Sequence, residues 1–186
     1  MVVKNIITIL AGIAVVVGVI AVIIVESVPD LDVVREDTQE LQTIENAEAA
    51  GYQNVDVARC VSSSEGAMGY HYVNFNLLDL DLDPSNPEIL VFVPGDNGEM
   101  RLGAVEYAVP IDLWDEGSVV PPRILGQPMH VNEELGLYVL HAWVYVENPS
   151  GVFTDWNPEV FCSANLPAFD RVTFGFNWRY GSFNHN

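Results

Sequence analysis

The stretch that decides the fold is residues 88–110, which read EILVFVPGDNGEMRLGAVEYAVP. Apolar residues dominate Glu88–Val93 and Met100–Val109, and the PGDNG segment between them is typical of a turn. Two such runs joined by a short turn predict a β-hairpin. Further strands are predicted at Tyr70–Asn74 and Leu137–Val146. No helix-length period separates the strands, so we expect antiparallel order.

The sequence before this region predicts helices. Asp37 or Thr38 can cap a helix over residues 37–50, which Gly51 would end. We therefore expect an α+β chain in which a transmembrane helix and a short helix precede a mainly antiparallel β-sheet, arranged as a sandwich or small barrel. The expected divisions are an anchor (1–28), an acidic juxtamembrane segment with the helix (29–54) and a β-rich domain (55–186).

The expected anchor is the run from Ile6 to Val25, which contains no charge and no proline. At about 1.5 Å per residue a helix of this length spans roughly 30 Å, the thickness of the hydrocarbon core of a bilayer. A cleaved signal peptide is the alternative, but its apolar core is usually shorter, and no Ala-x-Ala site follows Val25. The simplest topology is a single-pass cell-membrane protein with its C-terminal domain outside the cytoplasm.

The composition is strongly acidic, with 26 acids against 7 bases and a formal net charge of −19. Nucleic acid is a poor partner for such a chain, because phosphate binding needs a basic face. The balance suits either an acidic extracellular protein or a high-salt exterior, where screening weakens repulsion between acids.

The two cysteines, Cys60 and Cys162, lie near the two ends of the most patterned region. Outside the cytoplasm an even number of cysteines favours a disulfide. A cysteine-containing metal site is the alternative, but no CxxC or other close ligand spacing supports it.

Candidate chemistry lies in three histidines and one acid. His71 and His141 fall within predicted strands, Glu106 lies on an otherwise apolar strand face, and His130 follows a proline-rich connection. Imidazole and carboxylate donors from separate strands can converge on Zn, Cu, Mn or Fe, with Zn or Cu as the expected cofactor. The alternative is that each histidine is a hydrogen-bonded core residue. No catalytic residue is assigned, and binding is favoured over turnover.

Residues 171–180, RVTFGFNWRY, alternate with a period of two and place aromatic residues on one face. This pattern predicts a strand whose aromatic side chains either fill the core or dock a protein partner or the membrane interface.

The motif order resembles a family of exported bacterial and archaeal proteins of unassigned function. The matching segments are Cys60, GAMGYHYVN (66–74), DPSNPEILVF (83–92), LGAVEYAVP (102–110), PPRILGQPMH (121–130), LHAWVYVENPSGVFTDWNP (140–158) and Cys162. The resemblance covers roughly residues 45–162 and brings no activity with it. It implies that the three histidines, Glu106 and the cysteine pair lie within matched motifs.

Two functions follow as hypotheses. The first is a membrane-anchored extracytoplasmic domain that binds a metal ion or small ligand through the His/Glu cluster. The second is a non-catalytic structural or accessory subunit of a membrane or cell-surface assembly, contacting its partners through the anchor and the aromatic strand.

Overall fold

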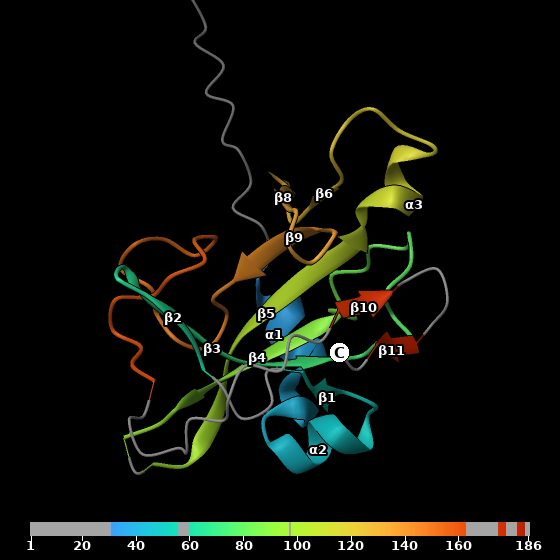
Figure 1. Ribbon diagram of the computed structural model, residues 1–186. Coiled ribbons are helices and arrows are strands. Elements are labelled where there is room, and N and C mark those ends of the chain that lie inside the picture. Colours follow the sequence, from blue (N-terminus) through green and yellow to red (C-terminus); the bar gives the residue numbers. More distant parts are fainter. Residues whose placement is uncertain (1–30, 56–59, 97, 163–174, 178–181, 185–186) are drawn as a thin grey trace, which may run out of the picture.

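A computed structural model describes residues 31–55, 60–96, 98–162, 175–177 and 182–184. Its main feature is a seven-stranded antiparallel sheet in the order β1-β3-β4-β5-β9-β8, with β2 also paired to β3 (Figure 1). The strands of this sheet are β1 (Gln53–Asn54), β2 (Val61–Ser63), β3 (Gly66–Val73), β4 (Ile89–Pro94), β5 (Met100–Pro110), β8 (His130–Asn132) and β9 (Leu137–Ala142).

Short elements complete the described chain. They are the helices α1 (Leu31–Asp37), α2 (Ile44–Ala49) and α3 (Ile111–Asp115), the 3-10 turn η1 (Gln39–Leu41), and two small hairpins, β6 (Arg123–Ile124) with β7 (Gln127–Pro128) and β10 (Gly175–Asn177) with β11 (Ser182–Asn184). The expectation of a mainly antiparallel sheet with few helices is confirmed. The main sheet is open, since its order runs from β1 to β8 without closing among the described strands.

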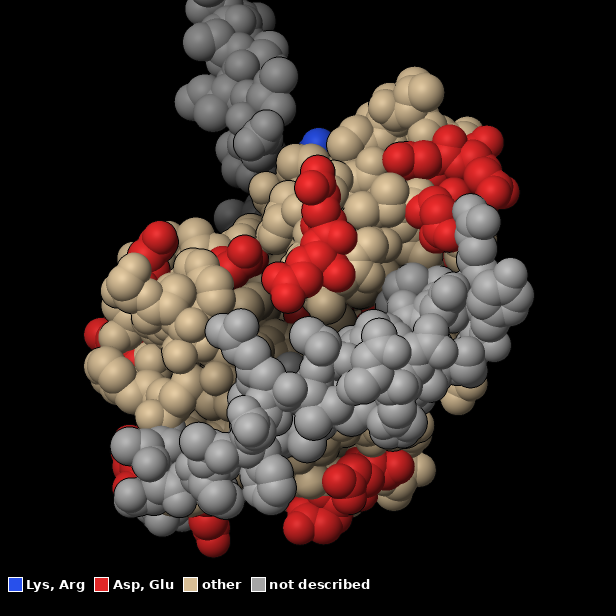
Figure 2. Space-filling model, in the orientation of Figure 1, with Lys and Arg blue, Asp and Glu red and all other residues tan. Residues whose placement is uncertain are grey.

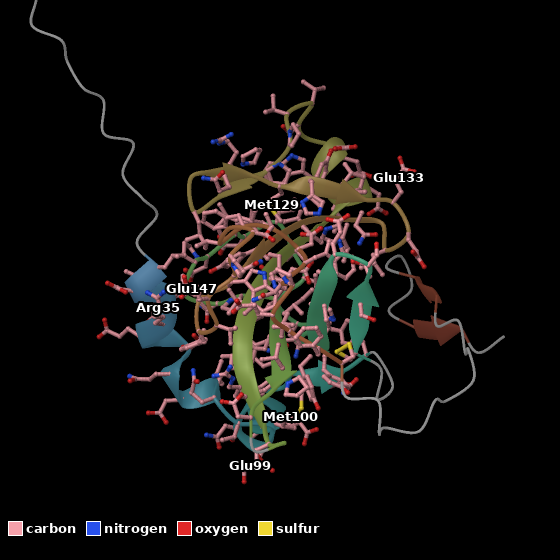
Figure 3. The ribbon with its side chains drawn as sticks, turned by 90° about the vertical axis from the view of Figure 1, so that its left-hand side faces the viewer. Arg35, Glu99, Met100, Met129, Glu133 and Glu147 are labelled. Atoms are coloured by element: carbon pink, nitrogen blue, oxygen red, sulfur yellow. A yellow bond between two sulfur atoms is a disulfide. The ribbon has the colours of Figure 1, made fainter. Side chains whose placement is uncertain are left out.

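The predicted hairpin is confirmed as β4 and β5, at the centre of the sheet. Its register pairs Leu90 with Val105, and the turn is closed by a hydrogen bond from Gly95 N to Glu99 O at 2.7 Å. Figure 3 labels Glu99 beside this turn. Both strands are buried along most of their length because they have neighbours on both sides.

Both faces of the sheet carry apolar clusters. One cluster includes Tyr72, Leu90 and Phe92, and helices α1 and α2 add Val34 and Ala47 to it. The second cluster lies on the opposite face, and its members include Val73, Ile89, Val91, Ala104, Val139 and Trp143. Burial on both faces explains why the strands contain nearly continuous apolar runs.

The predicted helix over residues 37–50 is wrong in its extent, because the chain forms three short helical pieces between Leu31 and Ala49. The hydroxyl of Thr38 donates to the carbonyl of Val34 at 2.6 Å, next to the end of α1. Thr43 then caps α2, where its side chain accepts from Asn46 N at 3.3 Å. Hydroxyl side chains compete for backbone groups in this way and divide the segment.

The N-terminal helix is attached to the segment after β9. Arg35 donates from Nε to the carbonyl oxygen of Val144 at 2.6 Å, and the hydroxyl of Tyr145 donates to the carbonyl of Arg35 at 2.9 Å. Figure 3 labels Arg35 on α1. This contact holds two parts of the chain together that lie more than a hundred residues apart in sequence.

The predicted disulfide is present between Cys60 and Cys162, whose Cα atoms lie 5.5 Å apart. It appears in Figure 3 as the yellow bond. In the chain-entropy view, closing a loop of about 100 residues stabilises the fold by roughly 4–5 kcal/mol. The covalent link joins the chain just before β2 to the end of the long loop that follows β9.

Two sequence-based expectations fall on other parts of the chain. No helix among the described residues is long and apolar enough to cross a membrane, and the expected anchor at residues 6–25 lies outside them. Of the predicted aromatic strand at 171–180, Gly175–Asn177 forms β10, and its remaining positions lie outside the described residues.

Candidate metal centre

Three of the four predicted site residues lie side by side on one face of the sheet. His71 on β3 pairs with Val91, and Glu106 on β5 pairs with Ile89 on one side and with His141 of β9 on the other. Val91 and Ile89 belong to the second apolar cluster, and paired residues of neighbouring strands point to the same side. Strand register therefore directs all three side chains to that side.

The three side chains are close enough to share an ion. One potential ligand atom from each of His71, Glu106 and His141 can be chosen so that all lie within 4.8 Å of one another. His71 Nε2 lies 3.6 Å from Glu106 Oε2. Exposure is 8% for His71, 5% for Glu106 and 0% for His141, so the group lies in the interior. We call these three residues the triad.

His141 stands out because neither of its ring nitrogens has a hydrogen-bond partner among the described residues. Burial lowers the pKa of His141 to about 3, with a smaller contribution from the neighbouring His71. The ring is therefore neutral at physiological pH, as a metal-binding imidazole must be. Its ring centroid lies 4.8 Å from that of Trp143, which contacts the imidazole without satisfying its polar atoms.

The donor set of the triad is two imidazoles and one carboxylate. This combination binds Zn²⁺ in catalytic sites and Fe²⁺ in sites with open positions. Ligand atoms around a tetrahedral Zn²⁺ with bonds of about 2.1 Å lie roughly 3.4 Å apart. The present separations are at most 4.8 Å, so binding an ion would require the ligand atoms to approach one another by up to about 1.4 Å.

His130 does not join this group. It lies on β8 opposite Val139, and its Nε2 lies 3.4 Å from Oδ2 of Asp155. The hydrogen bond to Asp155 raises the pKa of His130 and lowers that of Asp155. His130 is also exposed, in contrast to the triad. The structure thus brings together three of the four predicted residues, while the His130 side chain pairs with Asp155.

Sequence reasoning missed two acids. Asp155 lies within the motif TDWNP, where a carboxylate in a proline-rich loop gives no signal of a histidine partner. Glu88 is 1% exposed, its carboxylate accepts from Ala108 N at 3.0 Å, and burial raises its pKa to about 8. An acid at the start of the apolar run ILVFV was the available signal for Glu88.

A surface hollow of about 370 Å³ adjoins the His130–Asp155 pair. Its lining includes Glu65, Ser150, Phe153 and Trp156 besides that pair. The negative charge of Asp155 also acts on His141, where it partly opposes the lowering of the pKa by burial.

The chain matches no protein-family model, no curated protein and no solved structure. The resemblance to exported proteins of unassigned function therefore stays a prediction.

Proposed function

We propose that this chain is a membrane-anchored extracytoplasmic domain that binds a divalent transition metal ion through His71, Glu106 and His141. The observation that carries the proposal is the buried, neutral His141, whose nitrogens have no partner in the described part of the chain although two other donor side chains lie beside it.

An unpaired polar atom in a protein interior is unfavourable by about 1–3 kcal/mol, and native proteins avoid such atoms. A histidine kept for packing alone would turn at least one nitrogen to a backbone group or a hydroxyl. A metal ion would satisfy one nitrogen of His141 and join it to His71 and Glu106, whose carboxylate supplies negative charge to offset that of the ion.

We favour Zn²⁺ as the ion. It accepts two imidazoles and a carboxylate, and it has no redox chemistry to be disturbed by an oxidising exterior. The disulfide agrees with such an exterior, since cytoplasmic thiols are normally kept reduced. Mn²⁺, Fe²⁺ and Cu²⁺ accept the same donors and are compared in the test.

The test is metal content per chain. The full-length protein, purified in a neutral detergent with its disulfide intact, is stripped with a chelator, reloaded with Zn²⁺, desalted and analysed for metal. We expect one tightly bound ion per chain, and its loss in His141→Ala and Glu106→Gln. Parallel loading with Mn²⁺, Fe²⁺ and Cu²⁺ ranks the metals.

The strong negative charge of the chain makes weak, scattered cation binding a concern (Figure 2 shows acidic groups across one face). Two variants control for it: His130→Ala removes an imidazole outside the triad, and Glu48→Gln removes an exposed acid on α2. Both should keep the ion. If the triad variants also keep it while remaining folded, the metal site is refuted and the accessory-subunit hypothesis takes its place.

A further inference from the structure

The hollow beside the His130–Asp155 pair has no role in the proposed metal site. It is formed where the turn after β2, strand β8 and the loop that follows β9 meet, and at about 370 Å³ it is large enough for a small organic molecule.

The lining has a distinct chemical character. It combines two aromatic rings, Phe153 and Trp156, with the carboxylates of Glu65 and Asp155. Neither lysine nor arginine is among the described residues that line it. His130 is the basic side chain in the described lining, and it is paired with Asp155. The Glu65 carboxylate would repel phosphates and carboxylates, so anionic ligands are disfavoured.

The two carboxylates differ in their surroundings. Asp155 already has His130 as its partner at 3.4 Å. Glu65 is exposed; its backbone N–H donates to Ser63 Oγ at 3.0 Å, while its carboxylate makes no ion pair with any described residue. Glu65 therefore supplies the negative charge that remains available to a ligand.

The walls of the hollow are held in place by backbone contacts. Ala67 and Asn157 exchange two hydrogen bonds of 3.1 Å, which fix the loop against the start of β3. The amide of Asn148 donates to Trp156 O at 3.0 Å and to Thr154 Oγ1 at 2.9 Å. Because the loop is fixed in this way, a ligand would meet aromatic rings that need little ordering.

We propose that this hollow binds a small organic cation, an alkylammonium or quaternary ammonium group, with Glu65 as its counter-ion and the rings of Phe153 and Trp156 against its methyl groups. Cations of this kind are attracted to the faces of aromatic rings and to carboxylates together. The proposal does not depend on the metal site, because none of its contacts involves the triad.

The test compares choline with 3,3-dimethylbutan-1-ol, which has the same shape without the charge. Binding to the full-length, metal-free protein in maltoside detergent and 150 mM salt is measured from the ligand methyl signals by NMR. We expect choline to bind about tenfold more tightly than the alcohol. Equal binding of the two would overturn the proposal in favour of a neutral ligand, and no binding of choline would also refute it.

Variants locate the site. Glu65→Gln and Trp156→Leu should each weaken choline binding several-fold. His130→Gln should strengthen it, since it removes an imidazole that can carry positive charge beside the Asp155 carboxylate. Glu48→Gln removes the same charge from the exposed surface of α2 and should change nothing. A loss in Glu48→Gln equal to that in Glu65→Gln would mean only a general field effect and would reject the hollow as the site.

Adding Zn²⁺ separates the two proposals. A metal ion in the triad adds positive charge near the hollow and should weaken choline binding, and choline should weaken Zn²⁺ binding by the same factor. If Zn²⁺ fails to bind while choline binds as described, the metal proposal fails and this one stands. If Zn²⁺ binds and choline does not, the reverse holds.

Discussion

Replacing His141 by leucine should stabilise the metal-free protein and destabilise the metal-bound one relative to wild type. The substitution removes two buried nitrogens that have no partner among the described residues and leaves an apolar side chain of similar size beside Trp143. The order of stability of the two proteins therefore depends on the metal.

The magnitude follows from the local contacts. Removing buried polar atoms that lack partners gains about 1–3 kcal/mol for each group, and imperfect packing of the new side chain costs up to about 1.5 kcal/mol. We expect a net stabilisation of about 2 kcal/mol without metal, or a rise of roughly 4–8 °C in Tm. Zn²⁺ at a hundred times its Kd should stabilise wild type by about 2.7 kcal/mol and the variant not at all, which reverses the order.

Without metal, acid should increase the difference in stability between His141→Leu and wild type. The pKa of His141 is lowered to about 3 from an ordinary value of 6.5, so the folded state holds the ring neutral while the unfolded state can protonate it. The stability that comes from the neutral ring is complete above pH 6.5 and is lost as the pH falls toward 3. Wild type should lose about 1.4 kcal/mol per pH unit below 6.5 relative to the leucine variant.

The assay is urea denaturation of both full-length proteins in detergent, at pH 7.5 and pH 5, with chelator or with Zn²⁺. His130→Leu is the matched control, because His130 is exposed and lies outside the triad. Zn²⁺ should stabilise this variant as much as it stabilises wild type. If metal-free His141→Leu is less stable than wild type at pH 7.5, the imidazole must make favourable contacts and this prediction is wrong.

Three further predictions concern the rest of the fold. Burial raises the pKa of Glu88 to about 8 from 4.5, so the contribution of Glu88 to stability is complete below pH 4.5 and falls as the pH rises toward 8. In urea denaturation, Glu88→Gln should therefore be as stable as wild type at pH 4 and more stable by a few kcal/mol at pH 8. The same difference in stability at both pH values would contradict this. Reducing the Cys60–Cys162 disulfide should lower the free energy of unfolding by about 4–5 kcal/mol. Denaturation with and without reductant measures this loss. A loss under about 1 kcal/mol would show that other contacts close the long loop. Gly66→Ala should lower the free energy of unfolding by about 3 kcal/mol or more, because its φ is 134° and a Cβ there would overlap the backbone of Asn157. Gly126→Ala, with φ 73° and open space around it, should lower it by only about 1–2 kcal/mol. Similar melting temperatures for the two variants would argue against the close approach at Gly66.

The central strands could be predicted because their signals are local. The run from Glu88 to Val93, the turn and the run from Met100 to Val109 each identify themselves from neighbouring residues. The end of β9 could not be predicted in this way. Apolar residues continue to Val146, but the strand ends at Ala142, where Trp143 N instead donates to Val152 O at 2.9 Å. That partner is set by tertiary structure.

The residue types of the candidate site could be predicted from the sequence, but their spatial arrangement could not. Acids and histidines in apolar strands indicated which side chains to consider, and three of them meet because β9 pairs with β5 in the register that places His141 opposite Glu106. That register depends on contacts far apart in sequence. His130 lies on β8 and pairs with Asp155, and nothing in the local sequence of either residue predicts the pair.

The disulfide has a topological consequence. It turns residues 60–162 into a covalent ring, and all three residues of the triad lie within it, while the N-terminal segment lies outside. A protease that cuts at the exposed Val119–Val120 segment would open the ring without releasing either fragment. Such a molecule would run as one band without reductant and as two with it. Cleavage in this loop would therefore leave the two halves of the domain covalently joined.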